Sequence, residues 1–192
     1  GFGPVEPAQL PPDEAWLAQL RDDVGYTKLE LDVGASTLRK TTIGLECDLS
    51  SVAKGYGVDR VAARLREQGL SRFMVEVGGE IVTAGRNERG EAWRIGIAEP
   101  VMTGGIRMVV PLVDRAMATS GDYQNTREID GRVVSHTIDP RTGRPVMHTL
   151  ASVSVIASLA VVADGLATAL EVLGPDDGYT LAVDRGWAAL FL

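Results

Sequence analysis

The chain has 192 residues, of which 45% are hydrophobic and 23% are charged, and its formal net charge is −7 at pH 7. This length and this apolar content suffice for one folded domain with a core, so an intrinsically disordered chain is excluded. The longest apolar stretch, 159–173, carries an aspartate and is too short to span a bilayer, and the negative charge argues against a nucleic acid partner.

The first half of the chain predicts two helices and a β-hairpin. Residues 1–12 are rich in proline and connective, and the chain starts at Gly1 without a methionine or a signal peptide, which indicates an internal start after lost targeting signals. In chain order we then expect a helix over 12–22, strands over 28–33 and 36–43 around Gly34, and a helix whose apolar residues Val58, Val61, Ala62 and Leu65 recur at helical spacing before Gly69.

The second half predicts a sheet and two further helices. Strands are expected over 72–77, 81–84, 93–97, 106–112, 132–138, 150–157 and 187–192, and helices over 158–173 and near 177–184. Ser158 is the expected N-cap of the first helix, and Gly174 with Pro175 is its expected stop. Because short connections join successive strands, antiparallel pairing is favoured. The predicted fold class is α+β, with helices packed on one face of a mainly antiparallel sheet.

Asp164 and Thr168 are four residues apart in the apolar helix 158–173, so they share one helix face. An ionised carboxylate in such surroundings is costly unless a cation or a hydrogen-bond donor offsets it. The pair therefore predicts a metal or phosphate site. The alternative is structural: the aspartate bonds a neighbouring loop and the threonine bonds a carbonyl of its own helix.

Asp48, Ser51 and Lys54 recur every third residue where the helix before Gly69 begins. In a first helical turn they project near free N–H groups and the positive end of the helix dipole, which suits a phosphate with its counter-ion. The alternative is simple N-capping by Asp48 or Ser50 with a solvated Lys54.

Two glycine-containing segments could admit a ligand. Gly55-Tyr56-Gly57 lacks the third glycine of a dinucleotide fingerprint and follows no parallel βαβ strand, so a Rossmann site is rejected. Gly78 and Gly79 interrupt a strand, where a flat ligand or another backbone could approach, although a turn or bulge explains them equally.

A second polar group of residues follows further along the chain. Ser120 lies in a strand-to-turn segment, 119–123, whose groups could hydrogen-bond the polar edge of a ring. His136, Asp139 and Arg141 accompany a tight turn just after a strand, so His136 is a candidate general base or a structural hydrogen-bonding residue. His148 is the only other histidine and Cys47 the only cysteine, which argues against multi-histidine and thiolate metal sites.

In this order these segments resemble the ApbE family of FAD:protein FMN transferases over almost the whole chain. The matching motifs are Asp48-Leu-Ser-Ser-Val-Ala-Lys-Gly-Tyr, Val77-Gly-Gly-Glu-Ile, Trp93-Arg-Ile-Gly-Ile, Thr119-Ser-Gly-Asp-Tyr, His136-Thr-Ile-Asp-Pro-Arg-Thr-Gly and Ala163-Asp-Gly-Leu-Ala-Thr. One such motif is weak, but six in sequence are specific.

The resemblance implies a T-fold-like domain over 1–192 that binds FAD and Mg²⁺, transfers FMN to a threonine of a partner flavoprotein and releases AMP. It matches Asp164 and Thr168 to metal-binding positions, with Ser51 a third ligand through its backbone carbonyl. Nucleotide contacts match Asp48, Lys54 and the main chain at Ile138; we add Gly78, Gly79 and Ser120 as candidate flavin contacts. His136 is the expected base for the acceptor hydroxyl, with Asp139 its competitor.

Family members have a substantial segment before the position of Gly1, which carries a lipoprotein signal and helps to hold adenosine. The expected location is therefore the extracytoplasmic (periplasmic) face of the bacterial cytoplasmic membrane, with contact to the membrane only through an N-terminal lipid anchor that this chain lacks. Two other functions stay open: an FAD pyrophosphatase that yields FMN and AMP, and a non-catalytic flavin-binding module.

Overall fold

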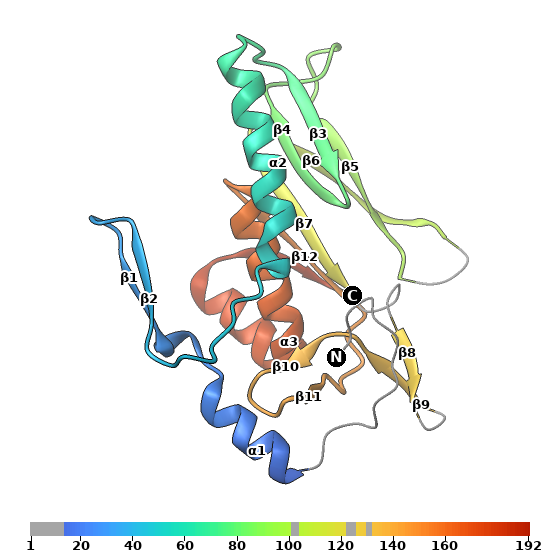
Figure 1. Cartoon of the computed structure of the whole chain (residues 1–192). Coiled ribbons are helices and arrows are strands. Elements are labelled where there is room, and N and C mark those ends of the chain that lie inside the picture. The colour runs from blue at the N-terminus through green and yellow to red at the C-terminus, as the bar shows by residue number, and fades with distance from the viewer. Residues whose placement is uncertain (1–13, 101–103, 122–125, 130–131) are drawn as a thin grey trace. The chain divides into compact units, whose positions relative to one another are not determined.

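A computed structural model describes residues 14–100, 104–121, 126–129 and 132–192 (Figure 1). The chain divides into two compact units, the first made of Gly1–Asp48 and Arg127–Val146 and the second of Leu49–Thr126 and Met147–Leu192. The predicted connective segment 1–12 lies outside the described residues, and so do Asp122 and Tyr123 of the motif that begins at Thr119.

The second unit is built around a five-stranded antiparallel sheet, whose strand order is β13-β12-β7-β4-β3. Its strands are β3 (Phe73–Val77), β4 (Glu80–Ala84), β7 (Ala116–Gly121), β12 (Ser152–Ala157) and β13 (Ala188–Phe191). Strands β5 (Trp93–Ala98) and β6 (Ile106–Leu112) pair only with each other among the described strands. The predicted α+β class with antiparallel pairing is confirmed, although the strands do not all join one sheet.

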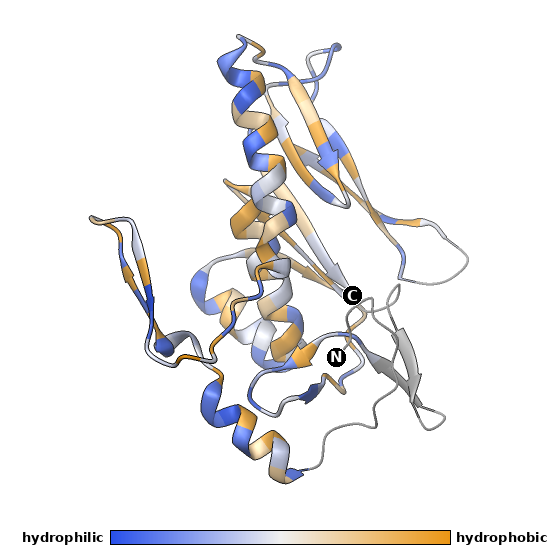
Figure 2. Ribbon diagram, viewed as in Figure 1, coloured by the Kyte–Doolittle hydropathy of each residue, from blue (hydrophilic) through white to orange (hydrophobic). Residues whose placement is uncertain are grey.

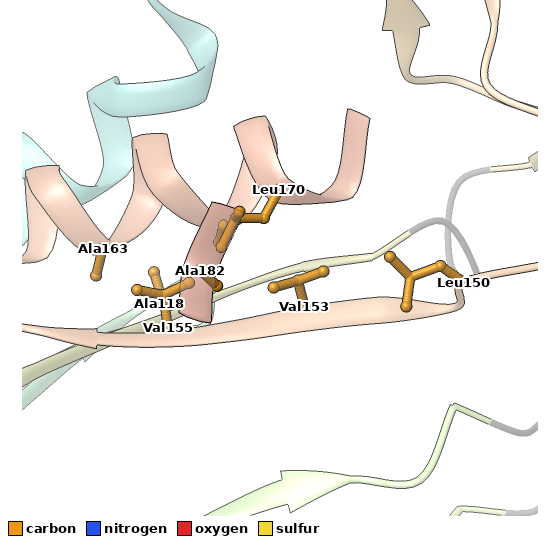
Figure 3. Close-up of a cluster of buried hydrophobic side chains, with 8 residues drawn as sticks. Ala118, Leu150, Val153, Val155, Ala163, Leu170 and Ala182 are labelled. Carbon is orange, nitrogen blue, oxygen red and sulfur yellow. The ribbon is translucent and has the colours of Figure 1, made fainter. Parts of the chain in front are cut away.

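Two helices, α2 (Ser50–Glu67) and α3 (Ala160–Arg185), cover one face of this sheet (Figure 1). Val58 and Ala62 of α2 pack against residues of β3, β4 and β7, as the predicted helical spacing requires. Along α2, hydrophobic and hydrophilic residues alternate, which is typical of a helix with one buried face (Figure 2). Leu170 of α3 packs with Val153 and Val155 of β12 (Figure 3).

The opposite face of the sheet is covered by the β5–β6 hairpin. Ile81 of β4 and Met117 of β7 are direct partners in the ladder, and both pack against Ile95, Ile97 and Leu112 of the hairpin. Because neighbouring residues of a strand point to opposite faces, Val82 and Ala116 face the helices instead. The expected packing of helices on one face of the sheet is confirmed.

Helix α3 contains the predicted stop and lacks the predicted cap. Gly174 has φ 83° and ψ −175°, so the helix breaks there, at the predicted position. Ser158 as N-cap is wrong: Leu159 occupies the cap position and makes no side-chain cap bond. The N–H groups of Ala160 and Val161 instead donate to the Asp59 carboxylate of α2, both at 2.9 Å. A cap supplied by another helix leaves no local sequence pattern.

Strand β7 was expected only as a strand-to-turn segment, yet it lies between β12 and β4 in the sheet. Its residues Ala116 and Ala118 are fully buried and have a weak intrinsic preference for strands. Their small side chains leave room for the helices that pack on them. Tertiary packing therefore decides the conformation of this segment.

The first unit contains short elements. They are α1 (Glu14–Asp23), a 3₁₀ helix (Tyr26–Lys28), β1 (Leu29–Asp32), β2 (Thr37–Lys40), β9 (Arg132–Ser135), β10 (Ile138–Asp139) and β11 (Arg144–Pro145), and β8 (Thr126–Ile129) pairs with β9. The predicted helix over 12–22 and the predicted hairpin are confirmed, although β1 and β2 are shorter than expected. The predicted strand 132–138 ends at Ser135. Among the described helices, none is both long and apolar enough to cross a bilayer.

Candidate functional site

Helices α2 and α3 pack closely against each other at Gly55. A Cβ at this position would lie 2.4 Å from the carbonyl oxygen of Ala160 and 2.8 Å from the Cβ of Asp164, so only glycine fits without backbone movement. The Gly55 N–H donates to Asp164 Oδ2 at 2.8 Å, and Asp164 is only 5% exposed. The structure therefore joins two predicted motifs, one beginning at Asp48 and the other ending at Thr168.

The predicted metal ligands have oxygen atoms near this crossing. In a regular helix the Gly55 N–H donates to the Ser51 carbonyl, so the Asp164 carboxylate competes with that carbonyl for the same hydrogen. Thr168 Oγ1 donates to the Asp164 carbonyl at 3.3 Å, which is the structural alternative considered for this threonine. A hydroxyl that donates in this way still has lone pairs to offer to a ligand.

Lys54 reaches from α2 to the turn between β3 and β4. Its ammonium group lies 2.5 Å from Glu80 Oε1 and 3.5 Å from the carbonyl oxygen of Gly78. Gly78 and Gly79 have φ of 63° and 98°, which is typical of a two-residue hairpin turn, so the predicted interruption is a turn. A Cβ at Gly78 would lie 3.5 Å from Lys54 Cδ, in ordinary contact with the lysine stem.

The charges of Glu80, Asp164 and Lys54 do not balance, because two of these side chains are acidic and one is basic. Glu80 is 0% exposed, whereas the Lys54 side chain is 50% exposed. Burial raises the pKa of Glu80; the hydrogen bond and the charge of Lys54 act against this shift, and the negative charge of Asp164 adds to it. Lys54 pairs with Glu80, and no ion pair among the described residues joins Asp164 to a cationic group, a charge balance that favours an additional cation.

Ser120 takes part in a different polar cluster, between β7, β12 and α3. Its hydroxyl donates to Oε2 of Glu171, which is also 0% exposed. His148 Nε2 lies 2.7 Å from the Glu171 carbonyl oxygen, and because a carbonyl can only accept, this nitrogen is the protonated one. The hydroxyl groups of Thr119 and Ser154 are 2.7 Å apart. Glu171 thus contacts the Ser120 hydroxyl through its carboxylate and the His148 ring through its backbone carbonyl.

The first unit holds Asp48, His136, Ile138 and Asp139. Asp48 is exposed and His136 is half-buried. The carboxylate of Asp139 accepts from the backbone N–H of Arg141 at 2.8 Å and from its Nε at 3.0 and 3.1 Å. The hydrogen bonds from Arg141 lower the pKa of Asp139, with the positive charge of the guanidinium acting in the same direction, while burial acts against them. A carboxylate held in this way is a weak base.

Ile138 and Asp139 form β10, which pairs with Arg144 and Pro145 of β11. The carbonyl of Asp139 accepts from the N–H of Gly143 at 2.8 Å, and Gly143 has φ 70°, so a tight turn closes this hairpin. The predicted turn is therefore present. The roles of His136 and Asp139 as base and competitor stay predictions.

The donor set at the α2–α3 crossing consists of oxygen atoms. Among the described residues, no group of three or more His, Cys, Asp or Glu side chains is arranged to hold a metal. Mg²⁺ commonly uses one or two carboxylates and keeps several waters, so a carboxylate, a backbone carbonyl and a hydroxyl fit its chemistry. Asp164, Ser51 and Thr168 supply those three oxygen types.

Three acidic residues with defined roles were not among the predicted site residues: Glu80, Asp59 and Glu171. Glu80 was visible only as the residue after Gly78-Gly79, and its contact with Lys54 links positions 26 apart. Glu171 lies three residues after Thr168 in an apolar helix, the same signal that identified Asp164. An acidic residue within an apolar helix is expected to be buried, so the same pattern also predicts burial of Glu171.

The chain matches known proteins along its whole length. The model of the ApbE family matches residues 1–191. An FAD:protein FMN transferase of Haemophilus influenzae is 42% identical over all of this chain and 57% of its own length. One from Vibrio cholerae is 44% identical over 95% of this chain and 54% of its own length. The chain thus spans a little over half of these relatives.

Solved structures agree with the computed fold. The apo form of the flavinyl transferase ApbE of Pseudomonas stutzeri superposes with a TM-score of 0.87 at 41% identity, over 100% of this chain and 58% of that one. A flavin transferase ApbE of Vibrio cholerae gives a TM-score of 0.85 at 39% identity, over 100% of this chain and 60% of that one.

Proposed function

The chain belongs to the ApbE family, and from this we propose that it takes part in transferring FMN from FAD to a threonine of a partner flavoprotein, with Mg²⁺ present and AMP released. In this reaction the threonine oxygen bonds to the FMN phosphorus, the bond from that phosphorus to the AMP oxygen breaks, and the threonine proton passes to a base. FAD is the substrate, and the acceptor flavoprotein is the partner.

One observation carries the proposal: two motifs about a hundred residues apart meet where the Gly55 N–H donates to Asp164. The crossing gathers a buried carboxylate, the half-exposed Lys54 ammonium and the start of α2. A pyrophosphate ester is a dense anion, and an acidic protein needs local cations to hold it. Lys54 and a Mg²⁺ ion held by Asp164 would supply them.

Asp164, Thr168 and the Ser51 carbonyl would hold the metal, with the carbonyl favoured because the Asp164 carboxylate competes for its helical hydrogen bond. A bound Mg²⁺ supplies charge neutralisation at the phosphorus that is attacked. Lys54 orients the phosphate from the helix side. Gly78 and Gly79 keep the adjacent turn free of side chains, which supports their assignment as flavin contacts.

His136 is the base that we propose for the threonine proton. Histidine is the side chain that most often serves as a general base in enzymes. The competitor, Asp139, is bound by Arg141 and has a lowered pKa, so it is less suited to accept one. Within the hairpin, Asp139 instead holds the turn after Ile138, whose main chain we propose as a nucleotide contact.

Family resemblance supports a location on the extracytoplasmic face of the bacterial cytoplasmic membrane, reached through an N-terminal lipoprotein anchor. The reaction needs a protein acceptor with an accessible threonine. Where water enters in place of that threonine, the same residues would support hydrolysis of FAD to FMN and AMP.

The test incubates the full-length protein with FAD, Mg²⁺ and a candidate acceptor, and the acceptor is then weighed by mass spectrometry. Added FMN mass supports transfer, free FMN with AMP alone shows a pyrophosphatase, and unchanged FAD shows a binding module. Asp164→Asn is expected to abolish turnover at limiting Mg²⁺, because an amide keeps the shape but not the charge. Asp184→Asn, at an exposed position near the end of α3, is the matched control and is expected to retain turnover.

A second test concerns the proposed base. His136→Ala is expected to slow transfer ~10²–10⁴-fold while leaving FAD affinity nearly unchanged, since a general base acts in the transition state. Weakened FAD binding with an unchanged maximal rate would reassign His136 to ligand positioning.

A further inference from the structure

Glu80 is the first residue of β4 and is fully buried, yet it is only half satisfied. Its Oε1 accepts from the Lys54 ammonium, whereas its Oε2 is buried without a hydrogen-bond partner among the described residues. A Cβ built on Gly78 would lie 3.6 Å from this Oε2, so the oxygen lies under the glycine turn between β3 and β4.

This arrangement is a poor one for stability alone. Taking a carboxylate out of water is costly, and a buried ion pair offsets the cost only when further hydrogen bonds satisfy its remaining oxygen. Lys54 is half exposed, so its attraction to Glu80 is partly screened by solvent. A glutamine at this position could still accept from Lys54 without the cost of a buried charge.

A carboxylate at position 80 supplies a negative charge, which a glutamine could not. Asp164 and Glu80 interact unfavourably through their like charges, and Lys54 offsets only one of them. A divalent cation beside Asp164 would turn this repulsion into attraction. The unpartnered Oε2 could then accept a hydrogen from one of the several waters that Mg²⁺ retains.

We propose that Glu80 is a positioning residue of this site: its buried carboxylate fixes the Lys54 ammonium and supplies, with Asp164, the negative charge that attracts the divalent cation. The proposal rests on the proposed function, because it assumes the cation at Asp164. Outer residues that hydrogen-bond a metal's ligands commonly change metal affinity 10–100-fold when replaced. Glu80 acts through Lys54 and through water, without touching the reacting atoms.

The test is a Mn²⁺ titration of the full-length protein without nucleotide, followed by electron paramagnetic resonance. Glu80→Gln is expected to weaken Mn²⁺ binding about 10-fold, and Glu80→Asp, which keeps the charge, is expected to restore part of the affinity. Glu171→Gln is the matched control, because Glu171 is the other fully buried glutamate of this unit and contacts Ser120 instead of Lys54. It is expected to bind Mn²⁺ like the wild type.

Lys54→Met is a second variant, and its Mn²⁺ affinity is expected to change in the opposite direction to that of Glu80→Gln. Removing the ammonium leaves the negative charge of Glu80 uncompensated, so Mn²⁺ affinity is expected to rise about 3-fold or more. If Glu80 only stabilises the fold, Glu80→Gln leaves Mn²⁺ affinity unchanged, and that result overturns the proposal. Should Glu80→Gln fail to fold, Glu80→Asp is titrated in its place, and an affinity equal to that of the wild type overturns the proposal.

Asp164→Asn separates this proposal from the proposed function. If wild-type protein binds Mn²⁺ and Asp164→Asn abolishes binding, while Glu80→Gln binds normally, then the metal site stands and only the role of Glu80 is wrong. If Asp164→Asn binds Mn²⁺ like the wild type, the metal site itself is misplaced and both proposals fall.

Discussion

Two glutamates of the second unit are equally buried, but the described side-chain partners of their carboxylates differ. Glu80, at the start of β4, contacts an ammonium group that is half exposed to solvent. Glu171, inside α3, accepts from the hydroxyl of Ser120, and its backbone carbonyl accepts from His148. Burial of an acid therefore does not by itself identify a ligand site. The charge and the solvent exposure of the acid's hydrogen-bond partner separate the two cases. An acid paired with an exposed cation can contribute to ligand binding, whereas one bonded to a neutral hydroxyl stabilises the core.

The contact between α2 and α3 brings Asp164 to the Gly55 N–H, and breaking that contact has the largest expected effect. Gly55→Ala places a Cβ 2.4 Å from the Ala160 carbonyl oxygen, which a backbone shift must relieve. We expect a loss of about 3 kcal/mol in the free energy of unfolding, measured by urea denaturation. The Ser120–Glu171 end of α3 lies beyond this contact.

The control for this substitution lies two residues away on the same helix. A Cβ at Gly57 would meet nothing within 4 Å, so Gly57→Ala is expected to be neutral or to stabilise the protein by ~0.5–1 kcal/mol. Equal losses for the two variants would show that helix propensity, and not the approach to Ala160, governs the result.

Asp59 sets the position of α3 at the same crossing, with a smaller expected effect. Its two oxygens accept the N–H groups of Ala160 and Val161, which are otherwise unsatisfied at the start of a helix. Asp59→Ala is expected to cost ~1–2 kcal/mol in thermal or urea unfolding. Arg60→Ala, an exposed neighbour, is the control, and a similar loss there would contradict a capping role.

The sequence predicted the features that depend on neighbouring residues, and it did not predict the contacts between α2 and α3. Local patterns sufficed for α2, for the break at Gly174 and for the helix that carries Asp164 and Thr168, because helical spacing and glycine stops act over a few residues. The place of Lys54 near the start of α2 was likewise predicted from the local pattern, whereas its role in ligand binding stays a prediction. Each of these inferences needed only neighbouring residues.

The sequence could not show contacts that form between distant segments. The cap of α3 comes from Asp59, 101 residues earlier, and it replaces the expected Ser158. Gly55 was examined only as a dinucleotide glycine, whereas its requirement comes from the Ala160 backbone. Strand β7 was missed because its alanines favour a strand only when helices cover them. In each case tertiary packing overrides a local preference.

The contribution of Glu80 to stability is expected to fall as the pH rises. Burial raises the pKa of Glu80, so the folded protein holds its proton more tightly than the unfolded chain does. Its contribution to stability is therefore fully present below the unfolded pKa, near 4.5, and is lost as the pH rises through the folded pKa. Glu80→Gln is expected to be neutral or to stabilise the protein at pH 7 by up to about 1 kcal/mol, even as cation binding weakens.

The measurement is the free energy of unfolding between pH 4 and pH 8 without divalent cations. Glu76→Gln is the matched control for the substitution itself, because Glu76 lies in the same hairpin but is exposed. A loss of stability at pH 7 in Glu80→Gln as large as in Gly55→Ala would show that Glu80 is kept for the fold, like Glu171.

Asp139 is a buried carboxylate of the first unit that can be compared with Glu80 and Glu171, and its partner Arg141 is on its own turn. Hydrogen bonds from Arg141 lower the pKa of Asp139, so its contribution to stability is present above the unfolded pKa, near 3.8, and is lost as the pH falls through the lower folded pKa. Because the Arg141 side chain is 55% exposed, solvent screens the pair, and Arg141→Gln is expected to cost only ~0.5 kcal/mol at pH 7. Unfolding at pH 7 and at pH 2.5 measures this, with the difference between variant and wild type expected to shrink at the lower pH. A difference that stays constant would mean that Arg141 acts through packing of its stem, and the contrast among the three carboxylates would then rest on Glu80 and Glu171 alone.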